Sequence, residues 1–273
     1  MLPETFQFTQ GKLQDYADCA RRFQLRHVLM QPWPALITES PGALEQQMQR
    51  GADLHRLARQ HASGIDPQRL EQTIHDETLF RWWQVFLAHP PSSLPQAVRR
   101  AEVVLAAPFA GYRLVARIDL LAADPGQRLV VVDWKTVHNP PPRATLALRL
   151  QTRVYRLLAV EAGDAFNKNV RPRPEQVEMI YWFAVQGGVT QRFPYDSEQH
   201  TADREYLAGL IREIATEQSS IWPLTPEERH CRLCKYRSLC ERGVKPGFLE
   251  DLEDDIEPPD ITIDLEQIAE VQF

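Results

Sequence analysis

Two short segments place acidic and basic side chains in patterns that suit metal-assisted chemistry. In the segment Asp133-Trp134-Lys135, alternation along a strand would put the first and third side chains on one face and the tryptophan on the other. The segment Arg117-Ile118-Asp119 repeats this arrangement one predicted strand earlier, with its isoleucine facing the core. Carboxylates from neighbouring strands can together hold a divalent cation, which offsets the cost of placing them side by side.

The chemistry available to such a pair is phosphoryl activation. A cation held by Asp119 and Asp133 would polarise a phosphoryl oxygen and lower the pKa of a bound water. Lys135 could then orient that water or stabilise the charge that develops on the phosphoryl group. An Asp-x-Lys pattern is common by itself, so a surface ion pair at a strand end is the alternative interpretation of Asp133 and Lys135.

Two predicted helices carry polar side chains that could complete the site. Gln151 and Tyr155 are four positions apart, so both lie on one face of their helix. His55 lies on an earlier helix whose apolar side includes Leu54 and Leu57. A single helical histidine is more often a core or surface residue than a ligand, and that alternative stays open for His55.

The four cysteines are the second group of chemically distinctive residues. Cys19 stands alone, whereas Cys231, Cys234 and Cys240 follow a C-x2-C-x5-C pattern. Four thiolates at one site suit either zinc or a [4Fe–4S] cluster. An isolated first ligand is unlike the paired C-x-x-C motifs of zinc ribbons, which favours iron–sulfur. Unrelated buried thiols are the remaining alternative.

The elements that must position these residues alternate between helical and extended patterns. Helices are predicted over residues 11–30, 44–61, 69–89, 144–161 and 198–219. Strands are predicted over residues 101–106, 112–123, 128–134 and 177–184, with another after the glycine pair 187–188. The order of helix, three-strand meander, helix and strand predicts an α/β layered core with helical flanks at both ends.

Charge divides the chain into a body and a tail. The net charge is −6, but residues 248–273 hold ten acids and no lysine or arginine. Residues 1–247 then retain 31 basic against 27 acidic side chains, a mildly basic balance that is compatible with DNA binding. We expect one domain over residues 1–247, with a helical insertion at about 62–98, followed by an acidic tail over 248–273.

No apolar run of the sequence approaches the length that crosses a bilayer, Leu129–Val132 being among the longest. The segment Met1–Lys12 lacks a basic stretch followed by an apolar one, so no secretory signal is predicted. The expectation is a soluble cytoplasmic protein with no membrane partner. The sequence also lacks a G-x4-G-K-[ST] pattern, so any unwinding of DNA would need a partner.

Taken in order, these motifs resemble the iron–sulfur branch of the PD-(D/E)XK nuclease superfamily. That branch includes the C-terminal nuclease domain of AddB and the small CRISPR-adaptation exonucleases, and it is close to the RecB nuclease domain. The resemblance covers about Lys12 to Gly243. The matching motifs are Leu13-x2-Tyr16-x2-Cys19-x3-Phe23, Gly51-x3-His55, Arg117-Ile118-Asp119, Asp133-Trp134-Lys135-Thr136, Gln151-x3-Tyr155 and Cys231-x2-Cys234-x5-Cys240.

The resemblance implies a restriction-endonuclease-like mixed sheet core flanked by helices, with the N- and C-terminal segments joined by a [4Fe–4S] cluster. It implies a metal-dependent deoxyribonuclease, an exonuclease rather than an endonuclease, that trims single-stranded DNA ends in DNA repair, recombination or CRISPR-type defence. A helicase or a CRISPR-adaptation protein is the kind of partner implied. The alternative function is a non-catalytic DNA-binding or scaffold subunit of a nuclease–helicase complex.

The resemblance also implies roles for individual residues. The implied ligands of Mg²⁺ or Mn²⁺ are His55, Asp119, Asp133 and the backbone carbonyl of Trp134. The implied catalytic residues are Lys135, Asp119, Asp133 and Gln151, the last of which would position Lys135 or the water. The implied iron–sulfur ligands are Cys19, Cys231, Cys234 and Cys240, with structural zinc as the alternative. The expected DNA contacts are Tyr155, Arg117, Arg22 and Arg237.

Overall fold

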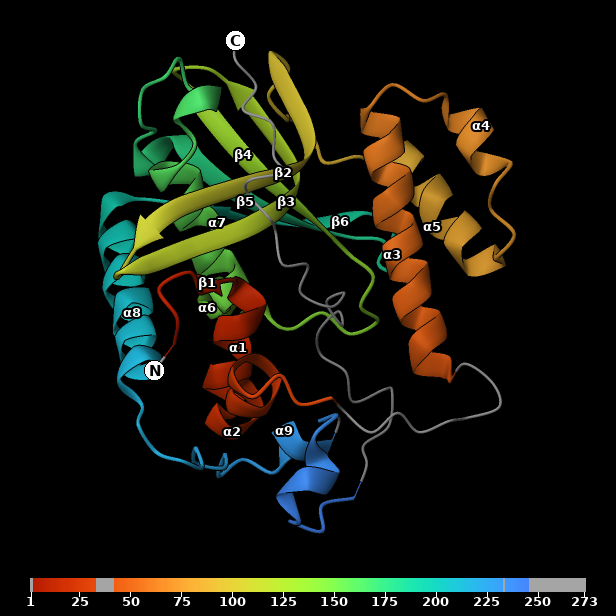
Figure 1. Ribbon diagram of the computed structural model, residues 1–273. Coiled ribbons are helices and arrows are strands. Elements are labelled where there is room, and N and C mark those ends of the chain that lie inside the picture. The colour runs from red at the N-terminus through yellow and green to blue at the C-terminus, as the bar shows by residue number, and fades with distance from the viewer. Residues whose placement is uncertain (1, 33–41, 233, 246–273) are drawn as a thin grey trace.

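The computed structural model describes residues 2–32, 42–232 and 234–245. The acidic tail expected at 248–273 therefore lies outside the described residues. Within them, helices cover both faces of a β-sheet, and a smaller helical lobe brings the two ends of the described chain together (Figure 1). No helix of this described part is long and apolar enough to cross a membrane.

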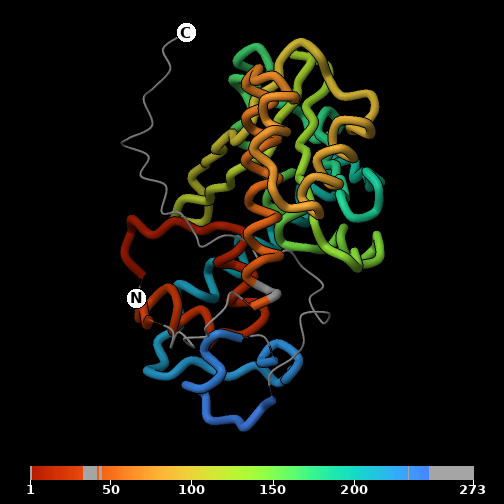
Figure 2. Tube along the Cα trace, turned by 90° about the vertical axis from the view of Figure 1, so that its right-hand side faces the viewer, coloured from red at the N-terminus to blue at the C-terminus, as the bar shows by residue number. Residues whose placement is uncertain are grey.

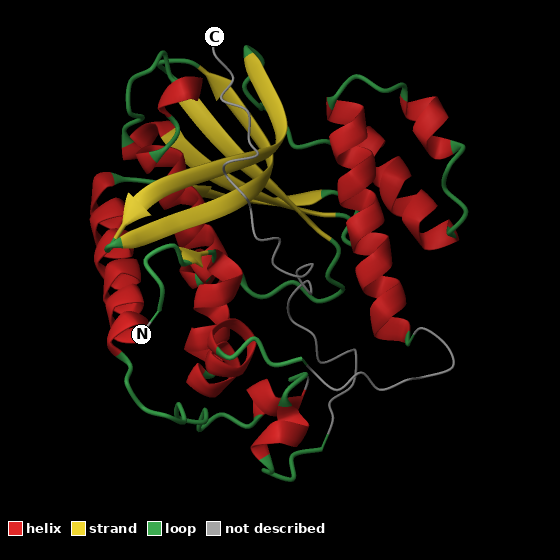
Figure 3. Ribbon diagram, in the orientation of Figure 1, coloured by secondary structure: helices red, strands yellow, loops and turns green. Residues whose placement is uncertain are grey.

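The sheet is mixed (Figure 3). Its strands in the described chain are β1 (Gln7–Phe8), β2 (Val98–Phe109), β3 (Tyr112–Asp124), β4 (Arg128–Lys135), β5 (Val177–Phe183) and β6 (Val189–Pro194). Their order is β1-β3-β4-β5-β6, and β2 also pairs with β3. The meander β2-β3-β4 is antiparallel, β4 and β5 run parallel, and β6 returns antiparallel to β5. The predicted α/β class, a mixed sheet flanked by helices, is confirmed.

A tight turn sets the register of the β2–β3 hairpin. Its two-residue loop, Ala110-Gly111, has φ angles of 49° and 85°, the left-handed pair that matches the twist of the flanking strands. In the resulting ladder, Ala101 pairs with Leu120 and Val103 pairs with Ile118, so the register is the same before and after Glu102. Glu102 therefore stands opposite Asp119, a residue of the predicted metal site.

Helices pack on both faces of the sheet and create two cores (Figure 1). The longer helices are α3 (Ala43–Ala62), α5 (Glu77–Ala88), α7 (Leu150–Glu161) and α8 (Ser197–Thr216). Alternate residues of β4 serve the two cores: Val131 packs with the α7 and α8 side, whereas Val130 and Val132 pack with α3 and α5. Because both faces of β4 are buried, its sequence is a continuous run of apolar residues.

The smaller lobe joins segments from the two ends of the described chain, as Figure 2 shows. It contains α1 (Gln10–Asp18), α2 (Ala20–Phe23), a π-helical turn (Gln24–Val28), α9 (Arg229–Arg232) and a 3₁₀ turn (Arg237–Cys240). Phe23 stacks on Trp222 with ring centroids 5.6 Å apart, and Gln24 donates a hydrogen bond to the carbonyl of Ser220. Aromatic packing and this amide contact hold the two segments together.

Three helices predicted as continuous are interrupted, so those predictions were wrong in detail. The first breaks at Cys19, where the backbone is extended, and the fourth breaks in the same way at Arg149. The third divides into α4 (Pro67–Glu71) and α5, because the Asp76 side chain caps the start of α5. The remaining short elements are α6 (Arg143–Leu148) and 3₁₀ turns at Asp164–Phe166 and Pro174–Gln176.

Candidate functional site

Strands β3 and β4 part at the point where the two aspartates lie. Their ladder ends at the pair Leu120 and Val132. Beyond it, Oδ2 of Asp119 accepts a hydrogen bond of 2.9 Å from the backbone N–H of Trp134. The Asp119 carboxylate thus accepts a hydrogen bond from a backbone N–H of β4 that lies beyond the end of the β3–β4 ladder. Asp119 is held against the same segment that carries the Asp-x-Lys motif.

Asp133 is buried, at 3% exposed, and each of its oxygens meets a different side chain. Oδ2 lies 2.9 Å from Nζ of Lys135, and Oδ1 accepts a hydrogen bond of 2.9 Å from Nε2 of Gln151. The structure therefore brings Asp133, Lys135 and Gln151 together. A surface ion pair, the alternative interpretation of the Asp-x-Lys motif, does not describe a pair of side chains that are both buried.

His55 reaches the site from α3. Its Nδ1 lies 3.1 Å from Oδ1 of Asp119, and its side chain is about one-third exposed. Trp134 points to the opposite face, where its ring packs against Phe86 and Trp182 at 5.1 Å and 5.6 Å between centroids. This aromatic packing anchors the backbone whose carbonyl is the fourth predicted ligand.

Burial and mutual charge control the protonation of the acidic pair. Burial raises the pKa of Asp133, and the nearby charge of Asp119 raises it further, although Lys135 acts in the opposite direction. Burial also acts to raise the pKa of Asp119, but the charge and hydrogen bond of His55 outweigh it, and the net pKa is lowered. The two carboxyl groups thus titrate as an interacting pair.

Glu102 is a third carboxylate at this site, and the motifs did not predict it. Its backbone has a φ of 54°, which is strained for a residue with a side chain, and the ladder is interrupted there. Burial raises the pKa of Glu102, and the charge of Asp119 also acts to raise it. Arg117, for which a DNA contact was predicted, lies with its Nε 3.1 Å from Oε2 of Glu102. One acid within the otherwise apolar segment 101–107 was the signal available in the sequence.

The donors at the site fit a divalent cation by their chemistry. In the described part of the chain, no group of three or more His, Cys, Asp or Glu residues is arranged closely enough to hold a metal ion. Oδ2 of the buried Asp133 is paired with the ammonium of Lys135 at 2.9 Å, an ion pair that lacks the geometry of a hydrogen bond. Two carboxylates, one of them 3.1 Å from an imidazole, supply oxygen donors of the kind that hard cations prefer.

Two of the residues expected to contact DNA are largely buried. Tyr155 is 4% exposed, and its hydroxyl accepts a hydrogen bond of 3.3 Å from Nε2 of Gln151. Arg22 has a side chain that is 17% exposed and lies with its Nε 2.8 Å from Oδ1 of Asp15. Both residues are placed to hold other side chains and offer little open surface to DNA.

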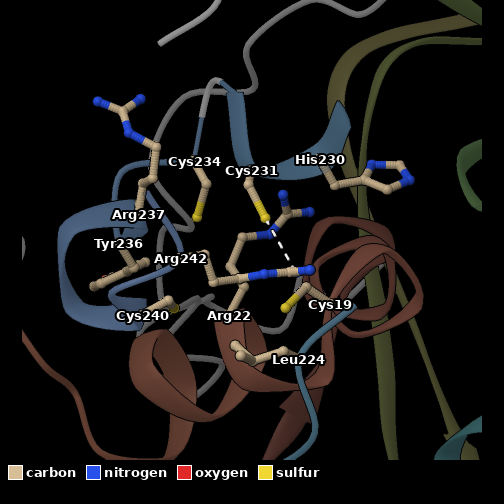
Figure 4. Close-up of a pocket in the computed structure, with 10 residues that line it drawn as sticks. All are labelled: Cys19, Arg22, Leu224, His230, Cys231, Cys234, Tyr236, Arg237, Cys240 and Arg242. Atoms are coloured by element: carbon tan, nitrogen blue, oxygen red, sulfur yellow. Dashed lines mark hydrogen bonds between the residues drawn. The ribbon is translucent and has the colours of Figure 1, made fainter. Parts of the chain in front are cut away.

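The four cysteines line one pocket in the smaller lobe (Figure 4). Cys19 enters it from the extended break between α1 and α2, and Cys231, Cys234 and Cys240 enter from α9 and the segment after it. None of the four forms a disulfide. Arginines surround the thiols: Arg22, Arg237 and Arg242 line the pocket.

The thiols interact with one another and with these arginines. Burial raises the pKa of Cys234 and of Cys240, and charge on the neighbouring cysteines acts in the same direction. Arg242 donates a hydrogen bond of 3.7 Å to Sγ of Cys231. The four cysteines share one pocket, but within the described residues they are not arranged closely enough to hold a metal ion. The iron–sulfur cluster itself is not shown and stays a prediction.

Comparison with known proteins gives the family. A family model for the PD-(D/E)XK nuclease superfamily matches residues 7–241. The chain belongs to this superfamily. No significant relative is found among curated proteins. The matched residues include both the sheet with its acidic pair and the lobe that holds the cysteines.

Two solved structures are similar at low sequence identity. One is a protein from Eubacterium rectale, provisionally named an exonuclease, at 10% identity and a TM-score of 0.48, covering 88% of this chain and 90% of that one. The other is SSO0001, at 13% identity and a TM-score of 0.34, covering 72% of this chain and 93% of that one.

Proposed function

We propose that this PD-(D/E)XK protein is a Mg²⁺- or Mn²⁺-dependent deoxyribonuclease that trims single-stranded DNA ends. The observation that carries the proposal is the convergence of two contacting pairs, His55 with Asp119 at 3.1 Å and Lys135 with Asp133 at 2.9 Å, and the charge interaction between their carboxylates. Buried like charges are costly to maintain. A purely structural role gives no reason to keep two carboxylates together, whereas binding a cation does.

The roles of the side chains follow from their contacts. His55, Asp119, Asp133 and the carbonyl of Trp134 would hold the cation, with Glu102 as a further candidate ligand. The cation supplies Lewis-acid chemistry at a phosphoryl oxygen when it is bound. Lys135, with Nζ 2.9 Å from Asp133, would keep its proton and either orient the attacking water or neutralise charge on the phosphate. Gln151 would fix the carboxylate of Asp133.

The cysteine pocket would hold a [4Fe–4S] cluster, with structural zinc as the alternative. Four thiols that share one pocket, and whose charges interact, support a tetrathiolate site. Such a site would tie α1 and α2 to the segment around α9, which lies more than 200 positions later in the sequence. Closing a loop of that length favours a structural role for the cluster over electron transfer.

DNA phosphates would contact basic residues of the smaller lobe. Exposed cations of that lobe include Arg229 and Arg232, and Arg237 lies at the rim of the cysteine pocket. Phosphate contacts of this kind would supply affinity without sequence preference. A helicase or a CRISPR-adaptation protein would supply any unwinding.

The test is cleavage of end-labelled single- and double-stranded DNA by the full chain, purified without oxygen, with Mg²⁺ or Mn²⁺ added. We expect metal-dependent shortening from the ends of single strands, blocked by EDTA. Lys135→Ala should remove cleavage while DNA binding persists. DNA binding without cleavage, by the unsubstituted chain with either metal, would instead support the non-catalytic scaffold.

A further inference from the structure

Tyr181 lies beside the acidic pair and contacts both side chains that hold Asp133. In the β4–β5 register, Asp133 pairs with Tyr181, so the two side chains leave the sheet on the same face. The centroid of the Tyr181 ring is 5.6 Å from Nζ of Lys135, within the range of a cation–π contact. Its hydroxyl lies 3.3 Å from Oε1 of Gln151. One buried tyrosine therefore adjoins both partners of the carboxylate.

The Tyr181 hydroxyl is also held by a hydrogen bond to Thr152 on α7. It lies 2.8 Å from Oγ1 of Thr152, and Thr152 donates its own proton to the carbonyl of Leu146 at 2.6 Å. Tyr181 therefore donates its single proton in a three-centre hydrogen bond, to Thr152 at 2.8 Å and to the amide oxygen of Gln151 at 3.3 Å. Because the phenol attracts the amide oxygen of Gln151, the amide NH₂ is left directed at Asp133.

Core packing alone does not explain a tyrosine at this position. Tyr181 is fully buried, and burying a hydroxyl is costly unless it is hydrogen-bonded. Phe183, two positions along β5 on the same face and in the same core, fills its space without a hydroxyl. The Tyr181 hydroxyl is thus an extra polar group whose contacts lead to Gln151 and, through it, to the acidic pair.

We propose that Tyr181 is a positioning residue of the nuclease site. Its hydroxyl fixes the amide of Gln151, and its ring supports the ammonium of Lys135, so that each oxygen of Asp133 keeps its partner. The inference rests on the proposed function, because it assigns Tyr181 a part in holding the groups that act on metal and phosphate.

The test is Tyr181→Phe in the full chain, which removes the hydroxyl and keeps the ring. We expect kcat on an end-labelled single-stranded oligonucleotide to fall about threefold to tenfold, the loss expected for one hydrogen bond, while KM changes less than about twofold. The Kd for Mn²⁺, measured by electron paramagnetic resonance, should rise about threefold, because Asp133 is less well fixed. In a Gln151→Ala background, Tyr181→Phe should lower kcat by less than about twofold further.

Tyr195→Phe is the matched control. Tyr195 is also buried, and its hydroxyl donates to Asp203 at 3.1 Å and not to a side chain that holds Asp133. This variant should lower Tm about as much as Tyr181→Phe, with kcat and Mn²⁺ affinity unchanged. If Tyr181→Phe matched Tyr195→Phe in kcat and in Mn²⁺ affinity, Tyr181 would be a core residue only. A chain that cleaves no DNA before substitution would refute the proposed function, and the Mn²⁺ affinities would still decide the role of Tyr181.

Discussion

Asp119 and Trp134 are joined by a hydrogen bond from a backbone N–H to a carboxylate, at 2.9 Å, where two strands separate. The contact gives the Asp119 side chain two tasks. It satisfies a backbone donor that the ladder has released, and it presents its other oxygen to His55 at 3.1 Å. The geometry of the site is therefore coupled to the stability of the sheet through a single side chain.

The two tasks of Asp119 can be separated by substitution. Asp119→Asn keeps an oxygen that can accept from Trp134 but loses the negative charge, so we expect no cleavage and a fold close to that of the unsubstituted protein. Asp119→Ala also leaves the N–H unpaired, which should cost about 1–3 kcal/mol more in the free energy of unfolding. Urea denaturation and cleavage with Mn²⁺ measure the two effects. Cleavage by either variant at a rate near that of the unsubstituted chain would rule out the assigned site.

Local patterns in the sequence predicted strands β2 to β6 and the order of the motifs, but not the two-residue strand β1. Alternation around Asp133 predicted which of its neighbours would share its face, and the structure brings Lys135 to it. Periodicity could not predict the break at Cys19, because the residues on both sides suit a helix and the break accompanies packing against a segment from the other end of the chain. The two packed segments are about 200 positions apart in the sequence, so a pattern of neighbouring residues cannot reveal their contact.

Residues that act through other side chains were also missed. Tyr181 reads as an ordinary aromatic strand residue, and its polar role depends on a helix that comes earlier in the sequence. Glu102 was passed over because its importance depends on the register of the β2–β3 hairpin. Tyr155 was expected at the DNA surface, but the apolar face of α7 carries it into the core.

The cysteine pocket predicts a measurable metal content. Protein purified without oxygen should be brown, absorb broadly near ~400 nm and contain about four iron atoms per chain. Cys240→Ala should lower Tm, because it opens a link between distant parts of the chain, whereas Ser238→Ala at a neighbouring exposed position should not. Iron analysis, acid-labile sulfide and calorimetry provide the measurements. Stoichiometric zinc without iron would establish the structural-zinc alternative.

Asp15 is the centre of a buried ion network that holds the smaller lobe. Its carboxylate lies 2.8 Å from Nε of Arg22, 3.0 Å from an Arg26 nitrogen and 2.8 Å from Nε2 of His27. Burial acts to raise the pKa of Asp15, but the hydrogen bond from His27 and the charges of both arginines outweigh it, and the net pKa is lowered. A carboxyl group whose pKa is lower in the folded than in the unfolded state stabilises the fold only while it is ionised.

Lowering the pH should therefore reduce the free energy of unfolding, because Asp15 becomes protonated. The stabilisation is complete well above the unfolded-state pKa of about 3.9 and is lost as the pH falls below that value toward the lower folded-state pKa. Asp15→Asn should cost roughly 2–3 kcal/mol in the free energy of unfolding near neutral pH, and much less near pH ~3. Urea denaturation of the unsubstituted protein and of Asp15→Asn, from neutral pH to pH ~3, tests this prediction. A difference between the two proteins that did not change with pH would contradict the ion network as the cause.

The acidic tail at 248–273, which lies outside the described residues, gives a prediction from charge alone. Its ten acids without a base should compete with DNA phosphates for the basic residues of the smaller lobe, among them the exposed Arg229 and Arg232. A chain ending at Gly247 should then bind single-stranded DNA more tightly than the full chain at low salt. The difference should shrink as salt is added, because screening shortens the reach of charges to ~8 Å at physiological ionic strength.

The control is the chain of 273 residues with the tail acids replaced by Asn and Gln, which should bind DNA as tightly as the shortened chain when measured by fluorescence anisotropy. Equal affinity of all three proteins at low salt would mean that the tail does not compete with DNA.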